Sequence, residues 1–225
     1  MDQQPSSTFG SYETARIIIP GFYFSTLLLF FVLCFAGPLA SLSVGGSILL
    51  LVFLFVTVVS GLTMYAKETT KRRKAFVENQ PSNFLKERSK TLRDTELLDD
   101  DSARKLYFYL LNHHVPASFH DKIFFFGTIY HIMILLRRTT FWFAIVSLAG
   151  ILAQFAAGKM YADQAASIFF ATAVWLIYLL NVRYNKADRK MQENYQDQIF
   201  WLEMNQDLVE GTIKQFTRSR SKHKK

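Results

Sequence analysis

Four long apolar runs without a single charged residue dominate this sequence. They cover residues 17–35, 47–66, 141–157 and 165–181. A helix needs about 20 apolar residues to cross a hydrocarbon core about 30 Å thick, and in lipid every backbone N–H and C=O must be paired within the helix. We therefore predict an all-α integral membrane protein with four transmembrane helices, a helical cytoplasmic module and an amphipathic C-terminal helix.

The first run is predicted to stay in the mature protein. A cleaved secretory signal has a basic start, a shorter apolar run and a small-residue cleavage site. Here Asp2 and Glu13 precede the run, and Arg16 is the one basic residue before it. Pro20 lies early in the run and is expected to begin the helix or to kink it, because proline lacks a backbone donor.

Lysine and arginine are distributed very unevenly between the segments that join the runs. Residues 67–122 hold twelve of the 26 and residues 183–225 hold ten, whereas the link between the first two runs holds none. Since basic loops stay in the cytoplasm, we predict that both termini are cytoplasmic. A bacterial inner membrane is slightly preferred as the location, with the endoplasmic reticulum as the alternative.

These assignments divide the chain into five segments. The predicted boundaries are a cytoplasmic N-terminal segment at 1–16, a transmembrane hairpin at 17–66, a cytoplasmic helical region at 67–138, a second transmembrane hairpin at 139–182 and a cytoplasmic amphipathic helix with a basic tail at 183–225.

The net charge of +8 is better explained by the membrane than by nucleic acid. Basic side chains beside a span meet anionic headgroups, each worth about 1 kcal/mol near the surface. We predict an anionic bilayer as a partner, and nucleic acid is not favoured. The predicted lipid contacts are Lys71, Arg72, Arg73, Lys74, Arg137 and Arg138.

The 67–138 region is predicted to fold as several helices. Pro81 interrupts it, a second helix is expected over 83–98, and Asp99 to Asp101 offer cap oxygens to a third helix that Pro116 ends. Ser118 and Asp121 have the spacing of a capping box for the next helix. Residues 123–136 are too short to cross and too apolar for a free surface, so they are predicted to lie at the membrane interface or in the helical core, with a re-entrant segment as the rival.

Two surfaces are candidates for assembly. An amphipathic stripe at helical spacing follows the fourth run, and it is expected to form a coiled coil between subunits or to pack on the chain's own 67–121 region. It comprises Met191, Tyr195, Ile199, Leu202, Val209, Ile213 and Phe216. Small residues at spacings of four, which allow helices to approach closely, form a ridge in the third run. The ridge comprises Ala149, Ala153 and Ala157, with Gln154 beside it.

Catalytic patterns are weak in this chain. The histidines and acids between 99 and 131 could supply metal ligands, but they lack the repeated histidine boxes of membrane di-iron enzymes, and the acids are accounted for as helix caps. They are Asp99, Asp100, Asp101, His113, His114, His120, Asp121 and His131. Cys34 lies inside a span, where a thiolate is disfavoured. We therefore predict no catalytic residue, no cofactor and no metal.

Three functions remain as hypotheses. The first is a non-enzymatic membrane subunit or scaffold whose cytoplasmic helices self-assemble or recruit a second protein. The alternative is an oligomeric pore or effector, for example of a bacterial defence system, triggered through the cytoplasmic module. The third is a lipid-acting membrane enzyme that uses the histidines and acids. No stretch of the sequence is specific enough to name a family.

Overall fold

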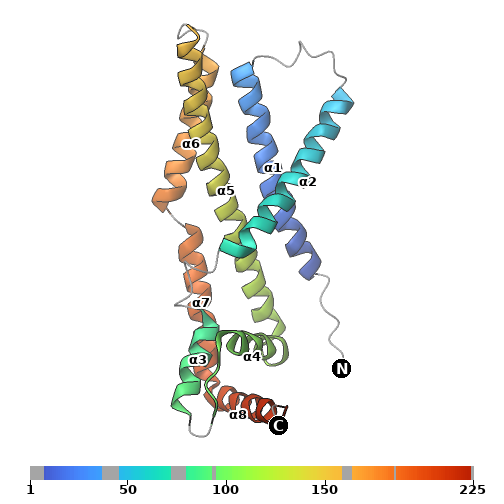
Figure 1. The fold of residues 1–225 in the computed structure, drawn as a ribbon, viewed down its shortest axis with the longest axis vertical. Helices are drawn as coiled ribbons and strands as arrows, with labels where there is room; N and C mark the ends of the chain where they lie inside the picture. Colours follow the sequence, from blue (N-terminus) through green and yellow to red (C-terminus); the bar gives the residue numbers. More distant parts are fainter. Residues whose placement is uncertain are drawn as a thin grey trace. The chain divides into compact units, whose positions relative to one another are not determined.

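The computed structural model describes residues 8–36, 46–71, 80–92, 95–158, 164–184 and 186–223. All regular structure in these residues is helical, in the helices α1 to α8 of Figure 1. Four helical stretches are long and apolar enough to span a membrane, which confirms the predicted fold class. They are Gly10–Phe35, Gly46–Lys67, Ala117–Ala156 and Ala165–Met204.

The chain divides into two compact units. The spanning unit contains residues Met1–Thr70 and Thr128–Ala187, and the polar unit contains Lys71–Gly127 and Asp188–Lys225. Each unit is therefore built from two stretches that are far apart in the sequence. The second predicted hairpin lies between the two stretches of the polar unit. This unit can therefore complete its fold only after the hairpin has been synthesised.

The spanning unit is held together mainly by aromatic packing around α1 (Thr8–Ala36) and α6 (Ala165–Tyr184). Leu27, Phe143, Phe170 and Val174 form its buried centre, with Phe31 packed against them. The ring centroids of Phe31 and Phe143 lie 6.2 Å apart at a steep angle, the edge-to-face geometry that aromatic pairs prefer.

Helix α1 crosses α2 (Gly46–Lys71) at two glycines. A Cβ on Gly21 would lie 2.0 Å from the Thr57 carbonyl oxygen, and one on Gly61 would lie 2.2 Å from the Ile17 carbonyl oxygen. The hydroxyl of Thr57 donates to Ser25 at 3.0 Å beside this crossing. Small residues let the two backbones touch, which is how helices without a hydrophobic driving force associate in lipid.

Helix α1 also departs from the sequence-based expectation at its start. It begins at Thr8 and continues through Pro20, so this proline does not begin the helix. Pro20 is the thirteenth residue of α1 and lies in the helix interior, where proline removes one backbone hydrogen bond and is tolerated when neighbouring groups satisfy the freed carbonyl.

Residues 123–136 belong to a single continuous helix, α5 (Ala117–Ala156). Its 40 residues would extend about 60 Å, roughly twice the thickness of a hydrocarbon core. The predicted interfacial helix and the predicted third span are thus parts of one element. The boundary between the two units falls inside it, between Gly127 and Thr128.

The polar unit begins with α3 (Pro81–Thr91) and α4 (Asp100–His113). The second predicted helix starts earlier and ends earlier than expected, because Pro81 occupies the first helical turn, where its missing N–H costs nothing. Asp99 caps α4 as predicted by accepting from the Ser102 N–H at 2.8 Å. The predicted capping box at Ser118 is wrong, since α5 already begins at Ala117 and Pro116 O accepts from the Phe119 and His120 N–H groups.

The amphipathic C-terminal segment forms two helices, α7 (Lys186–Met204) and α8 (Gln206–His223). Figure 1 shows α8 turned away from the direction of α7. The side chain of Asn205 at the junction donates to the Trp201 carbonyl at 2.8 Å. The sequence also predicts a helix before Pro81, over residues 68–79, and residues 72–79 of it lie outside the described part of the chain.

Candidate functional site

The amphipathic stripe forms the core of the polar unit. Leu202, Val209 and Ile213 are buried against Leu85 of α3 and Leu106 of α4, and Phe216 packs on the edge of the same cluster. Of the two arrangements that the sequence left open, packing on the chain's own 67–121 region is the one observed. Four of the seven stripe residues therefore pack in the core of the polar unit, while Met191, Tyr195 and Ile199 are half-buried.

Polar side chains on α7 are also buried in this unit. The hydroxyl of Tyr107 on α4 donates to the side-chain oxygen Oε1 of Gln198. Burial, followed by the charge of Tyr195 nearby, raises the pKa of Tyr107 far above its ordinary value. Asn194, one turn before Gln198, is 3% exposed, and neither polar atom of its side chain has a hydrogen-bond partner in the structure. Buried polar groups of this kind are costly unless they are paired.

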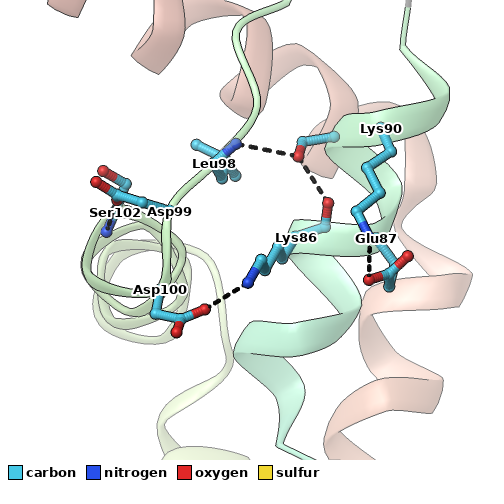
Figure 2. A network of polar contacts seen from close by, with 8 residues as sticks. Lys86, Glu87, Lys90, Leu98, Asp99, Asp100 and Ser102 are labelled. Carbon is cyan, nitrogen blue, oxygen red and sulfur yellow. Dashed lines mark hydrogen bonds and ion pairs between the residues drawn. The ribbon is translucent and has the colours of Figure 1, made fainter.

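The junction of α3 with α4 is stabilised by a short network of polar contacts (Figure 2). The Ser89 hydroxyl donates to the Lys86 carbonyl at 2.7 Å and accepts from the Leu98 N–H at 3.3 Å, which ties the loop to α3. Lys86 pairs with Asp100 at 2.7 Å and lowers the pKa of that carboxyl. This pair lies on the surface, so it orients the junction more than it stabilises it.

One face of α7 leaves large apolar side chains uncovered. Phe200 is 61% exposed and Met204, one turn later, is 70% exposed. They lie on the side of α7 opposite Asn194, Gln198 and Leu202, which are buried. Solvent-exposed apolar groups at neighbouring positions are typical of surfaces that meet another protein or a membrane.

The structure disperses the histidines and acids that could have formed a metal site. Asp99, Asp100 and Asp101 lie at the start of α4, whereas His113 and His114 lie at its end, a full helix length away. His113 donates to the Tyr109 carbonyl at 2.9 Å and His120 to Asn112 at 3.2 Å. Within the described ranges, no three His, Cys, Asp or Glu side chains are grouped so that they could hold a metal ion.

The fourth of these histidines, His131, belongs to a charged network in the spanning unit. Arg16 donates to a ring nitrogen of His131 at 2.7 Å and pairs with Glu13 at 2.8 Å. The Arg16 guanidinium lies 5.2 Å from the centre of the Tyr65 ring, and the Tyr65 hydroxyl donates to Glu13. The network joins α1, α2 and α5, and sequence analysis missed it because Arg16 and His131, which are in direct contact, lie 115 positions apart in the sequence.

No family model, curated protein or solved structure matches this chain.

The small-residue ridge and its glutamine face different surroundings. Ala149, Ala153 and Ala157 are exposed, so the chain's own packing leaves this face of α5 free. Gln154 instead packs inside the unit, where its side-chain amide donates to the Phe35 carbonyl of α1 at 3.4 Å. The side-chain oxygen of Gln154 is buried and has no hydrogen-bond partner in the structure.

The predicted lipid contacts are only partly within the described part of the chain. Arg72, Arg73 and Lys74 lie outside it, and the side chain of Lys71 is not described. Arg138 is exposed, and Arg137 is half-buried beside α6. The described residues thus offer an exposed apolar face on α7, an exposed small-residue face on α5 and basic residues next to the spans. These features suit binding to proteins or lipids.

Proposed function

We propose that this chain is a non-enzymatic, multi-pass membrane subunit whose spans anchor a folded helical unit that recruits a second protein or a second copy of itself. The observation that supports this most is the core of the polar unit, in which Leu85 and Leu106 from one stretch of chain meet Leu202, Val209 and Ile213 from another. A unit with its own core can present a fixed surface to a partner.

The surface that we propose for this contact is the exposed face of α7. Phe200 and Met204 are uncovered, whereas four of the seven stripe residues pack in the unit's core. Aromatic residues and methionine are enriched at the centres of protein interfaces. Burial of a Phe or Met side chain is worth about 1.5–3 kcal/mol each, enough to make the two residues the main contributors to a modest interface.

The orientation in the membrane belongs to the same proposal. Four spans place both ends of the chain on one side, and the density of lysine and arginine at 67–122 and 183–225 favours the cytoplasm for that side. The polar unit would then face the cytoplasm. A bacterial inner membrane stays our preferred location.

The proposal is tested by photo-cross-linking in the native membrane. A photoreactive amino acid at position 200 or 204 should yield a discrete cross-linked product of the full-length protein. The same amino acid at Glu87, an exposed position on α3, serves as the matched control and should yield much less of it. Equal cross-linking at all three positions, or none at 200 and 204, would contradict the proposed surface.

An oligomeric pore is the second candidate, and the exposed ridge of Ala149, Ala153 and Ala157 is the observation that favours it. Small residues on an uncovered helix face allow a second copy to pack closely in the bilayer. A dye that reports membrane potential separates the two functions, because only a pore depolarises the membrane.

A further inference from the structure

A crevice opens between α5 and α6 on the spanning unit. Its volume is about 310 Å³. Its walls are mostly apolar, formed by Met133 and Ile134 from α5 and by Ile177 and Leu180 from α6. Polar and basic groups line the rest of it, namely Arg137, Asn181, Tyr184 and Lys186.

The depth of these polar groups matches that of lipid headgroups. Arg137 lies 19 positions before Ala156, where α5 ends, and Tyr184 lies 19 positions after Ala165, where α6 begins. At about 1.5 Å per residue this separation is roughly 29 Å, close to the thickness of one hydrocarbon core. If the α5–α6 link lies at one surface of the bilayer, the cations of the crevice lie at the opposite surface.

The residues that line the crevice are chemically complementary to a phospholipid with a negative headgroup. Arginine presents five donors in a planar fork, so Arg137 can face a phosphate while it keeps other contacts. Lys186 adds a second cation and Tyr184 a hydroxyl. The apolar wall continues along α6 through Leu176 and Leu180, which are exposed and would lie against acyl chains.

We propose that this crevice binds one anionic phospholipid, with its phosphate between Arg137 and Lys186 and its acyl chains along Ile177 and Leu180. Basic pockets between transmembrane helices are known to bind anionic headgroups in this way. A water-soluble anion would gain nothing from the apolar wall. The site is independent of the α7 face, so it goes beyond the function proposed above and can fail or hold without it.

The test is native mass spectrometry of the full-length protein released from nanodiscs that contain equal amounts of phosphatidylglycerol and phosphatidylcholine. The wild-type chain should retain one phosphatidylglycerol preferentially. The double variant Arg137→Gln/Lys186→Gln should lower that preference about tenfold or more, as expected for two lost charge contacts. The matched control Arg138→Gln/Arg183→Gln removes two exposed basic residues that do not line the crevice, one from α5 and one from α6, and should leave the preference unchanged within about twofold.

A third variant tests the apolar wall with all charges in place. Leu180→Trp puts a larger side chain at a half-exposed position, so it should fold normally and still exclude the lipid. It also keeps the proposal testable if Arg137→Gln disturbs the fold. Equal loss of preference in both double variants would show diffuse attraction and overturn the site. Unchanged binding in Leu180→Trp, or displacement of the lipid by inorganic phosphate, would overturn the assignment to a phospholipid.

Discussion

Buried polar side chains mark the inner face of α7 at the scale of single residues. Gln198 accepts from the Tyr107 hydroxyl, and Asn194 lies on the same face with no hydrogen-bond partner for its side chain. Such groups contribute little stability compared with apolar packing, yet removing one member leaves the other unsatisfied at a cost of about 1–3 kcal/mol. Tyr107 therefore offers a direct test of how closely α4 and α7 pack.

Titration of Tyr107 should make the stability of the polar unit depend on pH in the alkaline range. Burial raises the pKa of Tyr107 in the folded protein above the pKa that the same tyrosine has in the unfolded chain. The contribution of the buried, neutral hydroxyl to the free energy of unfolding is therefore fully present below about pH 10 and is lost as the pH rises beyond it. Hydrogen exchange of the α4 and α7 amides, followed from pH 9 upward, should show this loss.

Two substitutions separate Tyr107 from the other groups that titrate at high pH. Tyr107→Phe should remove the part of the pH dependence that belongs to the buried hydroxyl, whereas Tyr109→Phe, at an exposed position of the same helix, should leave it intact. If Tyr107→Phe and the wild-type protein lose protection in parallel, the buried hydroxyl is not responsible.

Sequence analysis found the Asp99 cap but not the charged network, and the reason is physical. Asp99 acts over three residues, so its role can be read from local spacing. Glu13, Arg16, Tyr65 and His131 come together only when three helices pack, and no local pattern predicts that. The signal that was available is Arg16 itself, because a basic residue at the edge of a span needs a partner.

The closest packing of two elements is the crossing of α1 and α2 at Gly21 and Gly61. A side chain at either position would collide with backbone atoms of the other helix, which cannot move out of the way as a flexible side chain could. Few other described residues of α2 are buried. Besides this crossing, α2 contacts α1 through the Tyr65–Glu13 hydrogen bond and the ring contact of Phe22 with Phe53.

Gly61→Leu should loosen α2 from α1. Overpacking typically costs about 1–3 kcal/mol, and here the obstacle is a backbone carbonyl, so the upper part of that range is expected. The measurement is the thermal stability of the protein in mild detergent. Gly46→Ala is the control, because a Cβ at Gly46 meets nothing within 4 Å. Equal stability of both variants would show that the crossing is not maintained in solution.

Element boundaries show where periodicity succeeds and where it fails. The apolar runs predicted every span, because length and hydropathy alone decide which helices can cross lipid. Periodicity identified Val209 and Ile213 of α8 as buried, although it could not say what would cover them. On α7 the predicted Met191, Tyr195 and Ile199 are only half-buried, and the buried face carries Asn194, Gln198 and Leu202. Periodicity could not show that residues 123–136 and the third apolar run form one continuous helix, α5. The apolar pattern alone does not say whether a helix ends between two such stretches.

At the scale of the whole molecule, the chain combines a set of apolar spans with a polar helical unit assembled from both sides of the second hairpin. Composition indicated a polar part of the chain, since all charged residues except Asp2, Glu13 and Arg16 lie in the segments between and after the apolar runs. Composition could not reveal which apolar residues of the polar unit would remain exposed. Phe200 and Met204 became candidates only when Leu202, Val209 and Ile213 were seen in the core.

Native mass spectrometry of the full-length protein, purified gently from its own membrane, tests the central claim most directly. We predict a stoichiometric complex with a second protein or a second copy, and we predict that Phe200→Ser/Met204→Ser weakens it while Glu87→Ser does not. The two exposed substitutions should leave the fold unchanged, since neither side chain belongs to the buried core. A monomer that carries only lipid, or a complex that is indifferent to Phe200 and Met204, would contradict the account.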